Sequence, residues 1–102
     1  MTKRYDKLVR DKVPGRIRAG GETPKTHVAS PAEFRAALRS KLREEVDEYL
    51  VSGDIEELAD IMEVVYALAA LEGCGPEQLE GWRQRKLAYA GGFSERIILE
   101  EA

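Results

Sequence analysis

Apolar positions recur with helical spacing through the middle of the chain. After Ser30, apolar side chains follow one another at intervals of four, four, four and three residues, which places them on one stripe of a helix. Ser30 is a favourable N-cap, Pro31 suits the first turn, and Glu33 completes the pattern of a capping box. These signals predict an amphipathic helix from about 31 to 51, whose stripe is Phe34, Leu38, Leu42, Val46 and Tyr49.

A second helix is expected after a short break at residues 52–54. Gly53 suits the C-terminal cap of the first helix, and Asp54 suits the N-cap of the second. The second helix, about 55–71, is apolar almost all round, which predicts an interior helix. Because the break is short, the two helices should form an antiparallel hairpin.

Proline and glycine delimit the rest of the chain. Residues 1–29 contain several of both, which predicts irregular structure with a turn of helix after Pro14. Pro76 opens a third long helix to about 89. Two short apolar runs, Leu8-Val9 and Ile97-Ile98-Leu99, could pair as a small β element near the termini. The expected fold is therefore mainly all-α, in one domain spanning 1–102.

Composition narrows the class of protein. The 102 residues are 43% hydrophobic and 34% charged, which is typical of a soluble protein, and no apolar run is long enough to span a membrane. The charged start of the chain lacks the apolar core of a signal peptide, so we expect a cytoplasmic protein. One cysteine and one histidine argue against an internal disulfide and against a cysteine- or histidine-built metal site.

The net charge is −3, but the charged residues are distributed very unevenly along the chain. Residues 1–43 carry 12 basic and 4 acidic side chains, a net +8. Residues 44–82 carry 12 acidic side chains and no Lys or Arg, a net −12, and residues 83–102 carry 4 basic and 3 acidic ones. Such an acidic block repels itself unless cations or the basic ends neutralise it, although a solvated acidic face is the simpler interpretation.

Four of the acidic residues form two pairs with matching spacing. Glu45 lies within the apolar stripe of the first helix, and Glu48 stands one turn beyond it. Glu57 and Asp60 repeat this spacing next to apolar neighbours on the second helix. In an antiparallel hairpin the two pairs can face each other. Because their ligands are all oxygens, they predict a site for a hard cation, Mg²⁺ first and Mn²⁺ second.

Each of these residues also has a structural interpretation. Glu57 could complete a capping box with Asp54, and Glu48 could be an ordinary flank of a charged helix. Glu45 is the hardest to explain without a partner, because a stripe position normally takes an apolar residue and burying an unpaired carboxylate is costly.

Basic residues near both ends suit a phosphorylated ligand, although each could be plain surface charge. They are not interleaved with aromatic residues and the chain is acidic overall, so a nucleic acid polymer is not an expected partner. Trp82 and Tyr89 are interpreted as core or dimer interface, and His27 and Cys74 have no catalytic partners nearby in sequence. The basic residues in question are Lys7, Arg10, Lys12, Arg83, Arg85 and Lys86.

Three segments together resemble a known superfamily. Residues 5–14, YDKLVRDKVP, are similar to the opening of one small-protein branch of the MazG-like all-α nucleoside triphosphate pyrophosphohydrolases. The middle, KLREEVDE followed by ELADIME, resembles that superfamily's metal core, and the ending from Lys86 through Gly91-Gly92-Phe93 to Ile97-Ile98-Leu99 resembles the same branch. The resemblance covers nearly the whole chain. Asp6 and Ala90 depart from the branch's usual residues.

The resemblance implies an all-α oligomer, a dimer or tetramer, that hydrolyses a nucleotide with Mg²⁺ between its α and β phosphates. It implies Glu45, Glu48, Glu57 and Asp60 as metal ligands, with Glu45 as our candidate general base. One role that the resemblance implies for such an enzyme is the removal of non-standard nucleotides. Alternatives are a phosphoribosyl-ATP pyrophosphohydrolase and a non-catalytic helical dimerisation or regulatory module. The implied phosphate contacts are Lys86 and, more weakly, Lys7, Arg10 and Lys12.

Overall fold

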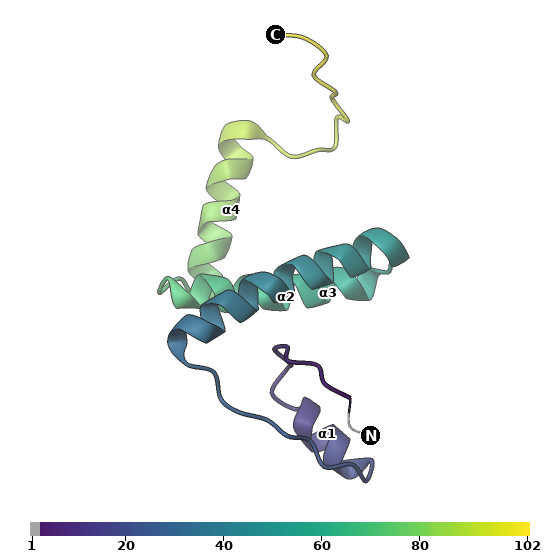
Figure 1. Ribbon diagram of the computed structural model, residues 1–102. Coiled ribbons are helices and arrows are strands. Elements are labelled where there is room, and N and C mark those ends of the chain that lie inside the picture. Colours follow the sequence, from purple (N-terminus) through teal and green to yellow (C-terminus); the bar gives the residue numbers. More distant parts are fainter. Residues whose placement is uncertain (1–2) are drawn as a thin grey trace.

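The computed structural model describes residues 3–102, and that range contains four helices. They are α1 (Val13–Ala19), α2 (Pro31–Ser52), α3 (Ile55–Leu71) and α4 (Pro76–Ala90). α2 and α3 lie side by side in opposite directions, and α4 rises steeply from the end of this hairpin (Figure 1). The all-α class and the hairpin are therefore confirmed. The turn of helix expected after Pro14 is part of α1, which begins one residue before that proline.

The start of α2 follows its sequence signals in part. Oγ of Ser30 accepts a hydrogen bond from the backbone N–H of Glu33 at 3.2 Å, and Pro31 is the first helical residue. The carboxylate of Glu33 lies 3.0 Å from Nε2 of His27 instead of accepting from the N–H of Ser30. The predicted capping box is therefore only half formed.

The turn between α2 and α3 depends on Gly53. Its φ of 69° lies in the left-handed region, where a side chain is strained, and its N–H donates to the carbonyl of Tyr49 at 2.8 Å. Asp54 occupies the N-cap position of α3, as predicted, although its side chain makes no capping hydrogen bond. Its backbone N–H donates to Oγ of Ser52 at 3.1 Å.

The expected β element is absent from residues 3–102. α4 points away from the hairpin, and it carries the C-terminal residues to the opposite end of the molecule from the N-terminal segment (Figure 1). Leu8-Val9 and Ile97-Ile98-Leu99 therefore cannot pair within one chain. An isolated two-stranded pairing would in any case be marginal in water, so packing elsewhere decides where these runs go.

Few apolar side chains are fully covered in the described part of the chain. Leu38 of α2 and Val64 of α3 are buried, with 2% and 7% of their surface exposed, and the two helices that carry them pack against each other. α3 was expected to be an interior helix, and this was wrong. It has one neighbour along its full length, so Ile55, Leu58 and Met62 on its other side remain exposed.

The molecule is extended. Its radius of gyration is 17.8 Å, whereas a compact chain of this length has about 13 Å. α4 contacts the hairpin only near its own start, and the residues after it run out into solvent (Figure 1). None of the helices in residues 3–102 combines the length and hydropathy needed to cross a membrane.

Candidate metal centre

Five carboxylates from α2 and α3 meet on the hairpin. Oxygens of Glu45, Glu57 and Asp60 lie within 4.8 Å of one another, and so do oxygens of Glu44, Glu45 and Glu48. Glu45 belongs to both groups and links them. The two helices thus bring together acids that stand up to 16 positions apart in sequence, Glu44 to Asp60. We call these five residues the acidic cluster.

Helix geometry explains why the acids converge. Residues three or four apart share one face of a helix, so Glu45 and Glu48 project together from α2, and Glu57 and Asp60 from α3. The short turn at Gly53 reverses the chain, which sets the last turns of α2 against the first turns of α3. The facing arrangement expected from the paired spacing is therefore present.

Two oxygens of the acidic cluster have no partner. Oε2 of Glu45 and Oε2 of Glu57 are buried and accept no hydrogen bond from any described residue. Leaving a buried acceptor unpaired costs about 1–3 kcal/mol, and more for a charged group. The capping-box interpretation of Glu57 does not account for this, because only its backbone N–H contacts Asp54, at the carbonyl.

Burial and mutual repulsion disfavour the charged form of these two acids. Burial raises the pKa of Glu45, the charges of Glu48 and Asp60 add to this, and Lys41 acts against it. Burial also raises the pKa of Glu57, and the charge of Glu48 raises it further. Both acids are therefore harder to ionise than an isolated glutamate.

Three basic side chains surround the acidic cluster. Nζ of Lys41 lies 3.3 Å from Oε1 of Glu45 and 3.5 Å from Oε2 of Glu44. Nζ of Lys7 lies 3.1 Å from Oε1 of Glu44. On the α3 side, a guanidinium nitrogen of Arg10 donates to Oδ1 of Asp60 at 2.6 Å. The basic N-terminal segment thus partly neutralises the acidic block, as its charge asymmetry suggests.

The ion pair between Lys7 and Glu44 shifts the pKa values of these two residues in opposite directions. Burial alone would raise the pKa of Glu44, but the hydrogen bond from Lys7 and the charge of Lys41 outweigh it and lower that pKa. The hydrogen bond to Glu44, with its charge, raises the pKa of Lys7. Glu44 therefore stays ionised next to the two acids that resist ionisation.

The residues present fit a divalent cation. The donors are all carboxylate oxygens, which suit Mg²⁺ and Mn²⁺ rather than softer metals. A cation held between α2 and α3 would give the orphaned oxygens of Glu45 and Glu57 a partner and would offset the repulsion within the acidic cluster.

The structure brings most, but not all, of the sequence-predicted site residues together. Glu45, Glu48, Glu57 and Asp60 lie in the acidic cluster, and Lys7 and Arg10 lie against it. Lys12 sits at the N-cap of α1 without an ion pair in the described range. Lys86 lies on the outer half of α4, which leaves the hairpin at the end away from the cluster (Figure 1).

Sequence reasoning missed Glu44. Its carboxylate lies with those of Glu45 and Glu48 and forms ion pairs with both Lys7 and Lys41. The available signal was its spacing of four from Glu48, which puts both on one helix face. A small hollow of about 110 Å³ adjoins it, lined in part by Lys7, Lys41 and Glu44.

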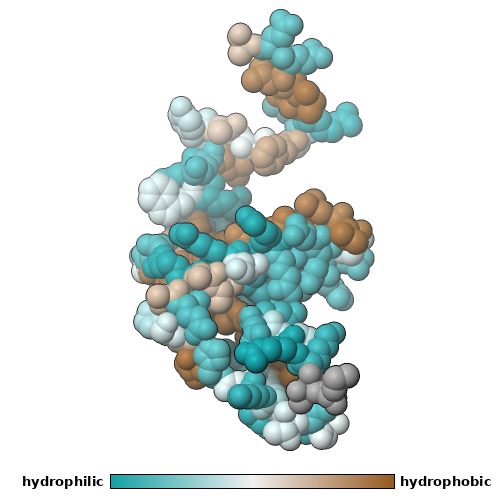
Figure 2. Space-filling model, in the orientation of Figure 1, coloured by the Kyte–Doolittle hydropathy of each residue, from teal (hydrophilic) through white to brown (hydrophobic). Residues whose placement is uncertain are grey.

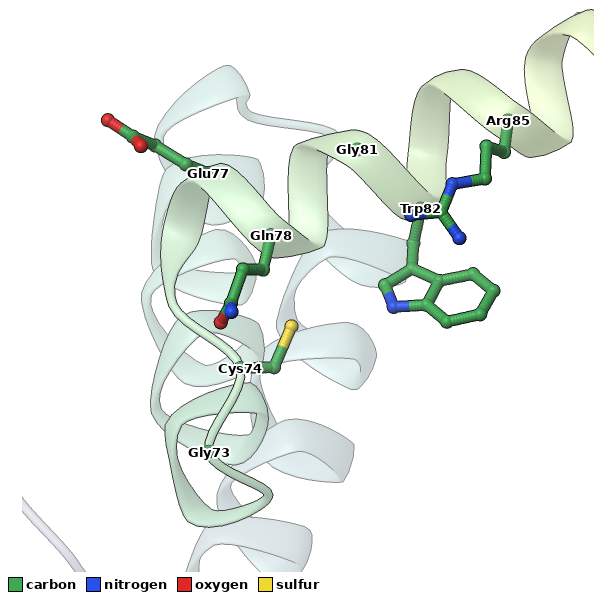
Figure 3. Close-up of a pocket in the computed structure, with 7 residues that line it drawn as sticks. All are labelled: Gly73, Cys74, Glu77, Gln78, Gly81, Trp82 and Arg85. Carbon is green, nitrogen blue, oxygen red and sulfur yellow. The ribbon is translucent and has the colours of Figure 1, made fainter.

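A larger hollow lies elsewhere, at the turn between α3 and α4. It measures about 430 Å³ and is lined by residues of that turn and of α4, among them Cys74, Gln78 and Trp82 (Figure 3). The guanidinium of Arg85 lies 4.5 Å from the centre of the Trp82 ring. Glu77 is the only carboxylate of its lining, so this cavity offers no cation site.

Comparisons with known proteins give one partial likeness. An uncharacterized protein of Mycolicibacterium smegmatis (strain ATCC 700084 / mc(2)155) is 54% identical over 41 residues, which is 40% of this chain. The chain covers 42% of that protein's length, so less than half of the relative is matched. No protein-family model matches the chain. No solved structure matches it either.

Proposed function

We propose that the acidic cluster holds Mg²⁺ and that the protein is a nucleotide pyrophosphohydrolase. The observation that carries the proposal is the pair of buried, unpartnered oxygens on Glu45 and Glu57, on facing helices. The choice of reaction rests on the resemblance of three sequence segments to MazG-like enzymes. Mn²⁺ is the expected substitute because it accepts the same oxygen ligands.

The proposed reaction splits one phosphoanhydride bond with water. A nucleoside triphosphate is cleaved between its α and β phosphates, giving a nucleoside monophosphate and pyrophosphate. When bound, Mg²⁺ supplies positive charge to the phosphates and makes a water molecule more acidic. The proposed ligands are the four predicted acids, with Glu44 as a further candidate from the structure; the predicted four are Glu45, Glu48, Glu57 and Asp60.

The chain's own side chains would then perform two tasks. Glu45, which lies in both carboxylate groups, is our candidate to accept a proton from the attacking water. Lys7 and Arg10 already stand at the rim of the acidic cluster, where they can turn from a carboxylate to a phosphate oxygen. Neither task needs a residue from α4.

Lys86 fits this scheme less well within one chain. The acids of α3 lie in its first two turns, and about 16 Å of helix separates Asp60 from the end of α3, where the chain turns into α4. A phosphate contact from Lys86 would therefore have to come from a second copy of the chain. The proposal therefore includes oligomerisation, which the resemblance to MazG-like enzymes implies.

The decisive experiment measures pyrophosphate release. The purified chain is incubated with standard, deaminated and oxidised nucleoside triphosphates and with phosphoribosyl-ATP, each with Mg²⁺ or EDTA. We expect release from at least one substrate that requires Mg²⁺, and the substrate identifies the class of nucleotide. The Glu45→Gln variant should lose this activity, whereas Asp47→Asn, an exposed acid on the same helix, should retain it.

Calorimetric titration with Mg²⁺ alone separates the two parts of the proposal. Folded protein that binds Mg²⁺ but releases no pyrophosphate would overturn the reaction and leave the metal site standing. Protein that binds no Mg²⁺ would overturn both. Full activity in Glu45→Gln would remove Glu45 from its assigned role.

A further inference from the structure

Residues 7–10 lie across the hairpin at the acidic cluster. Nζ of Lys7 lies 3.1 Å from Oε1 of Glu44 on α2, and a guanidinium nitrogen of Arg10 lies 2.6 Å from Oδ1 of Asp60 on α3. The steps from residue 7 to residue 10 span up to about 10 Å of extended chain, and the axes of packed helices lie about 8–10 Å apart. One short segment therefore reaches both helices, and we call residues 7–10 the strap.

The strap is held mainly by its side chains. In the described part of the chain, no backbone–backbone hydrogen bond joins it to α2 or α3. Leu8 and Val9 are half-buried, and Leu8 lines the hollow beside Glu44. Hydrophilic residues predominate where the N-terminal segment meets the hairpin, in the lower half of Figure 2. Both ion pairs of the strap are partly exposed, so each contributes little to its hold and the strap can detach at low cost.

The strap contacts carboxylates that a cation would use. Asp60 forms one group of converging oxygens with Glu45 and Glu57, and it accepts a hydrogen bond from Arg10. Glu44 belongs to the other group, and it accepts a hydrogen bond from Lys7. Each carboxylate group that could hold a metal ion therefore has one member engaged by the strap.

Strap and cation would oppose each other. A cation held by Asp60 and the guanidinium of Arg10 would share one carboxylate, and like charges at such short range repel. The exposed ion pair offers little to set against this repulsion. Because coupling between two binding events is reciprocal, a strap that weakens cation binding is itself loosened by the cation to the same extent.

We propose that the strap and a divalent cation compete for the acidic cluster, so that binding of the cation releases the strap from both helices. The competition rests on the metal site of the proposed function. The strap engages only the rim, because Oε2 of Glu45 and Oε2 of Glu57 have no partner in the described residues. A cation that reaches these oxygens gains contacts that the strap does not make. Release leaves Lys7 and Arg10 next to the bound cation, with their charges available for a phosphate oxygen.

Calorimetric titration with Mg²⁺ alone tests the competition without reference to any activity. Arg10→Ala should tighten Mg²⁺ binding by about two- to fivefold, which corresponds to the loss of one exposed ion pair. The double variant Lys7→Ala/Arg10→Ala should bind Mg²⁺ more tightly still. Arg18→Ala removes the same charge from the last turn of α1, outside the strap, and should leave the dissociation constant unchanged. Circular dichroism shows whether each variant keeps its helices.

Limited digestion of the wild-type chain with trypsin tests release of the strap directly. Mg²⁺ should speed cleavage after Lys7 and after Arg10 by the same factor of about two to five, because cleavage follows the population of the detached strap. Cleavage after Lys86, on the outer half of α4, is the internal control and should not respond to Mg²⁺. Mass spectrometry of the peptides identifies the sites.

The outcomes separate the strap from the metal site. Unchanged or weaker Mg²⁺ binding in Arg10→Ala would overturn the competition and leave the metal site standing. Equal tightening in Arg18→Ala would also overturn it, because the effect would then come from net charge alone. Protein that binds no Mg²⁺ would overturn the metal site and the competition together. If a variant fails to fold, the digestion of wild-type protein decides, and cleavage after Arg10 that does not respond to saturating Mg²⁺ rejects the release.

Discussion

A guanidinium nitrogen of Arg10 lies 2.6 Å from Oδ1 of Asp60, a residue 50 positions later in the chain. This contact ties the basic N-terminal segment to the first turns of α3, where the acidic cluster lies. Both side chains are about half exposed, so the ion pair itself contributes little to stability, about 0.2–1 kcal/mol. In the proposed function, Arg10 stands at the rim of the acidic cluster to contact a phosphate of the substrate.

Arg10→Ala should therefore impair substrate binding more than folding. If Arg10 turns to a phosphate oxygen, its loss removes a charge-assisted hydrogen bond worth about 1.5–3 kcal/mol, so KM should rise about tenfold or more. The melting temperature should change little. Steady-state kinetics and thermal unfolding measure the two effects, with Arg18→Ala, an exposed residue in the last turn of α1, as the control. An unchanged KM would exclude Arg10 from phosphate binding.

Glu45→Leu should stabilise the protein in Mg²⁺-free buffer. The substitution removes a buried carboxylate with an orphaned oxygen and places an apolar residue among Leu38, Leu42 and Val46, on the apolar stripe. The free energy of unfolding at neutral pH should rise by about 1–3 kcal/mol. Wild-type protein should gain stability when Mg²⁺ is added, whereas the variant should not. Denaturant unfolding with and without Mg²⁺ measures both, and a destabilised variant would contradict this account.

Glu44→Gln should weaken Mg²⁺ binding less than Glu45→Gln does. Glu44 belongs to one of the two carboxylate groups, and its charge is already shared by Lys7 and Lys41. Glu45 belongs to both groups. In titration calorimetry, the dissociation constant for Mg²⁺ should increase from wild type to Glu44→Gln and again to Glu45→Gln. Asp47→Asn should have the same dissociation constant as wild type. A reversed order would place the cation nearer to Glu44.

Glu80 should titrate well below other glutamates. Nε of Arg83 donates to its Oε2 at 2.8 Å, and this hydrogen bond lowers the pKa of Glu80 to about 2, with burial acting against it and Gln84 and the charge of Arg83 adding to it. Because the folded pKa is depressed, the stabilising effect of the pair is present above the ordinary value of 4.5 and is lost as the pH falls through about 2. Carbon-detected NMR titration measures the pKa directly, and Arg83→Gln should bring it back towards the ordinary value. A Glu80 that titrates normally in wild-type protein would contradict the pairing.

Two glycine substitutions should have opposite effects on stability. Gly53→Ala introduces a side chain at a φ of 69°, where it costs about 1–2 kcal/mol although nothing lies within 4 Å of the new Cβ. Gly81→Ala falls inside α4, also meets nothing within 4 Å, and should stabilise by about 0.5–1 kcal/mol through helix propensity. Denaturant unfolding of both variants checks the signs. Equal effects would show that Gly53 does not need its left-handed conformation.

The helices were largely predictable because their signals are local. Ser30 and Pro31 mark the start of α2, Gly53 marks its end, and the apolar spacing fills the interval. The pairing of acids on α2 and α3 was predictable for the same reason, since helix periodicity and a short turn fix which residues face each other. Glu45 was correctly expected to be buried, at 6% exposure.

The sequence by itself therefore determined the helices, the hairpin and the convergence of the acids. Tertiary structure alone decided which basic residues reach them: Lys7 and Arg10 do, through a segment without helical periodicity, and Lys86 does not. It also decided that α3 is covered on one side and that the terminal apolar runs lie far apart. The positions of Lys86 and of the C-terminal apolar run depend on the direction in which α4 leaves the hairpin. No periodic pattern encodes that direction, because it follows from a turn and from contacts between residues distant in sequence.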